Sequence, residues 1–556
     1  MWELQVPHSS FLRLSGVVDS RPPNLCLRPI LLDYFPSEAS VSMKIRQFVL
    51  LLLFGSTLTL CAQDIASFEK RIQVRKLPNG LTVILMQRNE APVFSFYTFV
   101  DVGSAQDPKG KTGLAHMFEH MAFKGTDQIG TTDYAAEKQA LAKVEDVYAQ
   151  YIAERDRRVG HDQAKQDALE KQWQAAIDDA DKYVVRNKFD EIVEQNGGVG
   201  MNANTAEDDT HYYYSMPANR MELWAYLEAS RFAHPVMREF YKERDVVYEE
   251  RRMRTESNPI GRLIEQFDSA AFMAHPYGIP GIGWPSDLHT FSATDAKAFF
   301  DKYYVPSNMT IAVVGDLQFD STWPIVEKYF GQLPTRPQPD ESLTVEPPQN
   351  AEREVILKEQ TQPIYLEGYH RPDYMDKDDL VFDAITDIMS SGRTSRLYRS
   401  LVRDKRIAIQ SAGFSGLPGT KYPHLFAFYA VPTPGHTTNE VRDAIHAEID
   451  RLKTQDITDD ELKMVKTRAR ANLIRGLGNN AGLAGQLATY QARFGDWREL
   501  FRDIDKIDKV TKADIRRVAN QYFVENNRTI GIIESTRMAG PRSPQAAQPS
   551  QQEQPK

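Results

Sequence analysis

A short pattern, His116-x-x-Glu119-His120, constrains this chain more than any other feature of its sequence. It lies within residues 113–123, which contain no proline and no internal glycine and therefore predict a helix. Positions i, i+3 and i+4 of a helix share one face. We expect both imidazoles and the carboxylate to point the same way, while the intervening Met and Phe side chains are buried. The polar face must then line a cavity or a cleft.

Histidine and glutamate in this arrangement are the side chains of a zinc site. Two neutral imidazoles and a carboxylate can hold Zn²⁺ and leave a fourth position for water. A second carboxylate, which is not a ligand, can take the proton from that water. The order H-x-x-E-H inverts the H-E-x-x-H signature of zinc peptidases. The alternative is that the two histidines and the glutamate met by chance on a structural helix. We expect such a pattern by chance in roughly a few per cent of chains with 12 histidines.

A carboxylate further along the chain can complete such a site. Residues 241–253 predict a second helix, in which Glu243 and Glu250 are two turns apart and share one face. Glu249 lies about 100° round the same helix from Glu250. A glutamate in such a helix is usually a solvated surface residue. The need for a third ligand favours Glu250, with Glu243 and Glu249 as the alternatives.

The composition is that of an ordinary globular protein, and it excludes several classes of function. The 556 residues are enough for two to four domains. A net charge of −9 argues against nucleic acid as the main partner. The only cysteines are Cys26 and Cys61, so the rest of the chain has no disulfide, no thiol catalysis and no cysteine-rich metal site.

Residues 43–62 have the pattern of a secretory signal peptide. A basic start precedes a largely apolar run that is too short for a comfortable membrane span. We expect residues 1–42 to be a dispensable leader, translation to begin at Met43, and the protein to be periplasmic or outer-membrane-associated in a Gram-negative-type bacterium. Weaker alternatives are lipidation at Cys61, with membrane association, and an uncleaved anchor helix.

Strands precede helices around the histidine pattern, which predicts an α+β fold. Two strand-like runs flank Asn79-Gly80 and predict a β-hairpin, and residues 93–102 predict a third strand. Residues 132–195 are rich in Ala, Glu, Gln, Lys and Asp and predict a long, charged, mostly solvated helical hairpin. Residues 308–316 predict a buried strand, and Pro324 is expected in the first turn of the helix that follows.

A stretch rich in proline and polar residues, 336–350, predicts a linker between two halves of the chain. The strand-then-helix order recurs after it, but no second H-x-x-E-H occurs there. If the unit is duplicated, only the first copy carries the metal. Residues 538–556 are rich in Pro, Gln and Ser, and we expect them to be disordered.

Taken together, these motifs resemble the pitrilysin/insulinase family of zinc peptidases, and most of all its branch with mitochondrial processing peptidase and bacterial relatives. The resemblance covers roughly residues 68–535, and four segments follow the family order: His116 to Thr126, Met201 to Thr205, Glu243 to Glu250, and Val313 to Asp316. It implies two similar α/β-sandwich domains that enclose a cleft. The catalytic zinc domain would span 68–335, with an inserted helical hairpin, and an inactive homologous domain would span 351–537.

The resemblance also implies a role for each residue of the site. One Zn²⁺ per chain would be held by His116, His120 and Glu250, with Glu119 as the general base. Glu243 would be a second carboxylate that helps to orient the site. His120 and Glu250 are much further apart in sequence than is typical of the family, and the helical insertion accounts for the excess.

Five further residues are candidates for substrate binding by the same resemblance. Asn202, Ala203 and Asn204 resemble part of the family's edge strand, at which an extended peptide is bound by main-chain pairing. Arg403 falls at the position of a substrate-binding Arg in the second domain, and an ordinary surface role is its alternative. Gln410 stands where the family has a Tyr, and it can hydrogen-bond but cannot stack.

The sequence therefore predicts a zinc-dependent endopeptidase that hydrolyses extended peptides or unfolded protein segments. The alternative is a non-catalytic or partner-dependent scaffold subunit of the same family. A homodimer, or a heterodimer with an inactive family member, is compatible with either function.

Overall fold

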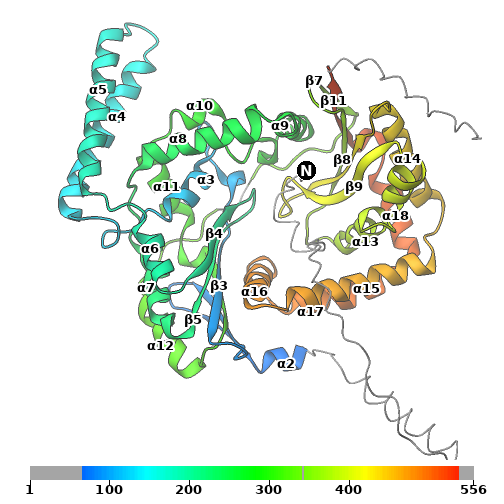
Figure 1. Cartoon of the computed structure of the whole chain (residues 1–556), viewed down its shortest axis with the longest axis horizontal. Helices are drawn as coiled ribbons and strands as arrows, with labels where there is room; N and C mark the ends of the chain where they lie inside the picture. Colours follow the sequence, from blue (N-terminus) through cyan, green and yellow to red (C-terminus); the bar gives the residue numbers. More distant parts are fainter. Residues whose placement is uncertain (1–64, 341–342, 537–556) are drawn as a thin grey trace, which may run out of the picture.

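The computed structural model describes residues 65–340 and 343–536 (Figure 1). The expected leader, signal peptide, both cysteines and the carboxy-terminal tail lie outside these residues. Among the helices of the described part, none is long and apolar enough to cross a membrane.

A six-stranded mixed sheet forms the first half of the molecule, in the order β1-β2-β6-β3-β5-β4. Its strands are β1 (Ile72–Lys76), β2 (Thr82–Gln87), β3 (Val93–Val100), β4 (Val199–Thr205), β5 (Thr210–Pro217) and β6 (Met309–Gly315). β2 and β6 are parallel, and the other neighbours are antiparallel. The predicted hairpin around Asn79-Gly80 is confirmed as β1 and β2, and every residue of β6 is buried, as expected of a central strand.

The helices of the first half differ in where they pack, and only some of them cover its sheet. They are α2 (Ile65–Glu69), α3 (Leu114–Met121), α4 (Tyr134–Arg155), α5 (Gln163–Ala180), α6 (Lys188–Gln195), α7 (Met221–Ala233), α8 (Phe240–Arg251), α9 (Pro259–Ala271), α10 (Pro285–Leu288), α11 (Ala293–Tyr303) and α12 (Phe319–Phe330). The expectation for Pro324 is wrong, since it lies inside α12. Trp323 and Val326 are buried on either side of it, and this packing offsets the lost backbone hydrogen bond.

Helices α4 and α5 form the predicted hairpin, which we call the arm, and it projects away from the rest of the molecule (Figure 1). Its base is packed tightly. The rings of Tyr148 and Trp173 lie 4.6 and 5.0 Å from that of Tyr241 on α8, measured between centroids. Arg244 of α8 lies over the same rings and donates to the Tyr148 hydroxyl at 2.6 Å. The arm is therefore solvated along its outer part and fixed to α8 at its base.

The second half repeats the topology of the first. Its sheet has the order β7-β11-β8-β10-β9, with β7 (Arg353–Glu359), β8 (Ile364–Arg371), β9 (Ala408–Leu417), β10 (His424–Pro432) and β11 (Arg528–Ser535). β7 and β11 are parallel, like β2 and β6, and the remaining neighbours are antiparallel. The order matches β2-β6-β3-β5-β4 strand for strand. This confirms the predicted pair of similar α+β units, with β1 as an addition to the first.

One helix of each half packs on the sheet of the other half (Figure 1). The second half contains α13 (Asp379–Ser390), the π-helical segment Tyr398–Asp404, α14 (Thr438–Thr454), α15 (Asp459–Gly476), α16 (Asn480–Phe494), α17 (Glu499–Lys509) and α18 (Lys512–Tyr522). α16 packs on β3 and β6, where Leu487 joins a core with Ile84. α9 packs on β7 and β11, where Phe267 joins a core with Ile533. The two halves thus share their cores.

Candidate active site

Helix α3 is fixed at its amino-terminal end by a carboxylate from the preceding loop. Its N-cap residue is Gly113, which has a φ of 95° and no side chain that could cap the helix. Asp107 accepts hydrogen bonds from the backbone N–H groups of Gly113 at 2.6 Å and Ala115 at 2.9 Å. These two hydrogen bonds satisfy backbone donors of the first turn, which have no partner within the helix. On the apolar side, the Phe118 ring stacks on Phe300, which leaves the histidine face of α3 free to line the site.

Helix α8 brings its carboxylates to that face. Glu250 Oε2 lies 3.6 Å from His116 Nε2 and 3.6 Å from His120 Nε2. The ligand atoms of these three residues all lie within 4.8 Å of one another. Within the described residues, no other group of three or more His, Cys, Asp or Glu side chains is placed to hold a metal ion.

The donors and their spacing fit zinc. Tetrahedral zinc with bonds of about 2.0–2.2 Å places its ligand atoms roughly 3.3–3.6 Å apart, and the two nitrogen–oxygen separations of 3.6 Å agree with this. The side chains of His116, His120 and Glu250 are 12, 22 and 15% exposed, so the site is sheltered but open to solvent. Three protein donors leave one position of a tetrahedron for water or substrate.

The remaining glutamates of the two helices differ in their surroundings. Glu243 Oε2 lies 3.4 Å from His120 Nδ1, the ring nitrogen that faces away from Glu250. Glu249 is 57% exposed and pairs with Arg252, so it points away from the histidines and does not compete with Glu250 as a ligand. Glu119 shares the histidine face of α3, and no described residue donates a hydrogen bond to its carboxylate. It is therefore available to accept a proton.

The surroundings shift the pKa values of the ligands themselves. Burial tends to raise the pKa of Glu250, but its hydrogen bond with His120 and the charges of His116 and Arg254 lower it to about 2. Burial lowers the pKa of His116. Burial also acts to lower the pKa of His120, but hydrogen bonds with Glu243 and Glu250 raise it to about 9 without a metal. Binding of zinc through His120 would therefore be coupled to loss of a proton from that ring.

The predicted edge strand lies beside this site. β4 carries Asn202, Ala203 and Asn204, is the last strand of its sheet, pairs with β5, and lies against α3. Ala203 is buried, whereas Asn202 is exposed. An outer edge of this kind can add a further strand. Peptide binding at β4 stays a prediction.

Arg403 and Gln410 lie in the second half, and each pairs with a residue of that half. Arg403 is 54% exposed and pairs with the adjacent Asp404. Gln410 stands on β9, the edge strand of the second sheet, and donates a hydrogen bond to the Tyr429 hydroxyl at 2.6 Å. The structure joins neither residue to the metal ligands, so their role in substrate binding also stays a prediction.

Sequence reasoning gave no role to three residues that support the site. Lys124 Nζ lies 2.5 Å from Glu243 Oε1, and Asp107 caps α3 as described above. Arg238 donates to the backbone carbonyl of Lys124 and forms a buried ion pair with Glu137. None of the three roles could be recognised from local spacing, because Lys124 and Asp107 lie in loops and the partners of Arg238 are distant in sequence.

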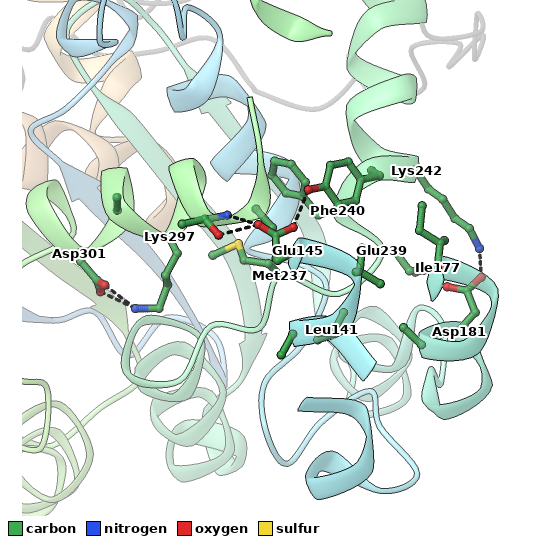
Figure 2. Close-up of a pocket in the computed structure, with 17 residues that line it drawn as sticks. Leu141, Glu145, Ile177, Asp181, Met237, Glu239, Phe240, Lys242, Lys297 and Asp301 are labelled. Atoms are coloured by element: carbon green, nitrogen blue, oxygen red, sulfur yellow. Dashed lines mark hydrogen bonds and ion pairs between the residues drawn. The ribbon is translucent and has the colours of Figure 1, made fainter. Parts of the chain in front are cut away.

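A pocket separate from the histidine site lies at the base of the arm (Figure 2). Its cavity of about 440 Å³ is walled by α4, α5, α8 and α11, with apolar side chains such as Leu141, Ile177 and Phe240. The ion pairs of Lys242 with Asp181 and of Lys297 with Asp301 close two of its sides. None of the metal-ligand candidates lines it.

Comparisons with known proteins point to one family of peptidases. The family model described as "Insulinase (Peptidase family M16)" matches residues 82–149, and "Peptidase M16 inactive domain" matches residues 290–469. The zinc protease PqqE of Helicobacter pylori is 28% identical, over 82% of this chain and 90% of that protein. A probable mitochondrial-processing peptidase subunit beta of Arabidopsis thaliana is 23% identical, over 83% of this chain and 78% of that protein.

Solved structures agree on the arrangement of the two halves. A protease from Helicobacter pylori superposes with a TM-score of 0.68 and 26% identity, covering 83% of this chain and 99% of that one. A peptidase M16 inactive domain from Pseudomonas fluorescens has a TM-score of 0.64 at 16% identity, covering 84% and 98%, which bears on the fold alone.

Proposed function

Because the chain belongs to the insulinase (M16) family of peptidases, we propose that it is a zinc-dependent endopeptidase for extended peptides or unfolded protein segments. One observation carries the proposal. His116, His120 and Glu250 converge with a spacing that fits one zinc ion, and the unpaired carboxylate of Glu119 stands on the same face of α3.

Each side chain has a distinct part in the proposed reaction. A zinc ion, when bound, would lower the pKa of a water molecule and polarise the scissile carbonyl. Glu119 takes the proton of the attacking water and returns it to the leaving amine. Glu243 accepts a hydrogen bond from Nδ1–H of His120, which would keep the Nε2 lone pair directed at the metal. The outer edge of β4 binds the main chain of the substrate, which gives affinity with modest sequence selectivity.

We further propose that the protein is exported and acts as an assembly of two chains. The signal-like segment 43–62 supports export. The relative named as a subunit of a mitochondrial-processing peptidase supports a homodimer or a pairing with an inactive family member. A non-catalytic scaffold role remains the second candidate, favoured by the lack of a second H-x-x-E-H and by the match to an inactive-domain model.

Cleavage of an internally quenched extended peptide, measured together with zinc content, tests the proposal. We expect the wild type to hold one zinc and to cut within the peptide. Glu119→Gln should hold zinc, while cleavage falls about 10²- to 10⁴-fold, because the general base is lost.

Glu249→Gln is the matched control, since Glu249 lies on the solvent side of α8 and should leave both readings unchanged. If the wild type holds zinc but cuts nothing, the scaffold or partner-dependent role replaces the proposal. If Glu119→Gln cuts as fast as the wild type, Glu119 is not the base.

A further inference from the structure

Lys124 is the sheltered cation beside the metal site. It stands in the loop after α3, and its side chain is 19% exposed. Its ammonium group lies 2.5 Å from Glu243 Oε1 and 3.9 Å from Glu239 Oε2. Glu243 thus connects Lys124 to His120, because its other oxygen lies 3.4 Å from His120 Nδ1.

The site is crowded with acidic groups, which makes this cation important. Glu119, Glu243 and Glu250 lie on the facing sides of α3 and α8, and Glu239 lies one turn before Glu243. Arg254, which pairs with Glu250, is 68% exposed and can exchange its partner for water. Lys124 is far less exposed, so solvent weakens its attraction to Glu243 less.

The geometry points to Lys124 as a positioning residue for His120, acting through Glu243; this rests on the proposed zinc site. A carboxylate with one oxygen fixed by an ammonium group has its other oxygen fixed as well. Oε2 of Glu243 then stays at Nδ1 of His120, accepts a hydrogen bond from Nδ1–H, and leaves the Nε2 lone pair directed toward Glu250 and the metal. Without Lys124, Glu243 is free to turn away from its acidic neighbours.

The backbone of Lys124 is itself held by a second, buried ion pair. Arg238, 1% exposed, donates to the carbonyl of Lys124 at 2.6 Å and to that of Thr126 at 3.0 Å. Arg238 also forms an ion pair with Glu137, which is fully buried at the start of α4 in the arm. The adjacent Gly125 has a φ of +87°, and a Cβ there would meet the Ile129 carbonyl at 2.3 Å. The base of the arm therefore fixes the loop from which Lys124 reaches Glu243.

Zinc affinity of the full chain, measured by competition with a chromophoric chelator, tests the inference. We expect Lys124→Met to weaken zinc binding about 10- to 100-fold, the range for residues that orient a metal ligand. Lys124→Arg, which keeps the cation, should retain most of the affinity. Lys138→Met is the matched control, because this lysine is exposed on α4, and it should bind zinc like the wild type.

A double-mutant cycle separates positioning from a general effect on folding. If Lys124 acts through Glu243, then Lys124→Met should add little to the loss already caused by Glu243→Gln. Lys124→Gln, which keeps a hydrogen-bond donor without the charge, serves if the methionine variant does not fold. Zinc binding by both uncharged variants as tight as that of the wild type overturns the inference, and so do fully additive losses.

Failure of the positioning role of Lys124 and failure of the proposed peptidase function give different experimental results. A wild type that shows this pattern of zinc affinities but cuts no peptide keeps the positioning role and rejects the peptidase. A wild type that cuts peptides while Lys124→Met and Lys124→Gln hold zinc normally keeps the peptidase and rejects the positioning role.

Discussion

The two halves have the same strand order, yet they differ at the place where a metal site could form. In the first half, α3 follows β3 and packs on α8; in the second, α13 follows β8 and packs on α15. The first contact holds imidazoles and carboxylates that converge with space for a metal. The second contact holds an ion pair, with Asp387 and Arg468 3.1 Å apart.

This difference shows that the fold supplies the location and the side chains supply the chemistry. In the second half, Asp387 of α13 already pairs with a cation from α15, Arg468, and no imidazole stands beside it on α13. In the first half, the two histidines and Glu250 compensate one another only in part. The second half contributes instead through α16, which covers the sheet that carries the site.

The largest effect is expected at Glu250, the proposed third metal ligand of the first half. Glu250→Gln removes the charged donor that lies 3.6 Å from both histidines, and zinc affinity should fall at least about 100-fold while the fold survives. Asp387→Asn, at the corresponding contact of the second half, should leave zinc content unchanged. Metal analysis of both purified variants gives the result. Full zinc retention in Glu250→Gln would show that another residue is the third ligand.

A second prediction concerns the interface between the two halves. Asp208, 3% exposed, accepts hydrogen bonds from the Tyr277 hydroxyl and from the backbone N–H groups of Thr420 at 2.6 Å and Lys421 at 2.9 Å. Asp208→Ala leaves three donors unpaired and should lower the free energy of unfolding by about 2–4 kcal/mol.

Denaturant unfolding, followed by tryptophan fluorescence, measures this loss. Asp167→Ala on the exposed side of the arm is the control and should change stability by less than about 0.5 kcal/mol. Equal stability of the two variants would mean that the shared cores, and not this polar contact, hold the halves together.

The stability of the protein should also depend on pH through Glu207, the residue before Asp208. Burial and the nearby charge of Asp208 raise the pKa of Glu207 to about 8, and its Oε2 atom is buried without a partner. A carboxyl group whose pKa is raised by folding does not lower the stability at pH 4, where it is protonated in the folded state. The free energy of unfolding falls as the pH rises from the pKa of the unfolded state toward 8. Glu207→Gln should therefore raise the stability at pH 8 by about 1–3 kcal/mol and leave it nearly unchanged at pH 4. Unfolding curves that shift equally at both pH values would contradict this assignment.

The smallest expected effect concerns the arm, which only the first half has. Tyr148→Phe removes the hydroxyl that accepts from Arg244 and donates to the carbonyl of Thr290 at 3.2 Å. The loss should be about 1 kcal/mol of stability. Val159→Ser, at an 88% exposed position of the arm's tip, should be neutral. If both variants are neutral in thermal unfolding, the base of the arm is not coupled to the core through this hydroxyl.

Local spacing in the sequence determined much of this protein. The i, i+3, i+4 spacing of His116, Glu119 and His120 fixed their common face, and the seven-residue spacing of Glu243 and Glu250 did the same on α8. Periodicity and turn residues also predicted the hairpin at Asn79-Gly80 and the helices of the arm. These features depend on neighbours within a few residues, so they can be read from the chain alone.

Tertiary structure decided what depends on distant partners. The choice of Glu250 over Glu249 required the position of α8 against α3, and the contact of Lys124 with Glu243 joins residues 119 positions apart in sequence. Core packing kept Pro324 inside a helix. The exchange of α9 and α16 between the halves left no local signal either, since an apolar helix face does not specify which sheet it covers. Such contacts arise only when the whole chain has buried its apolar surfaces together.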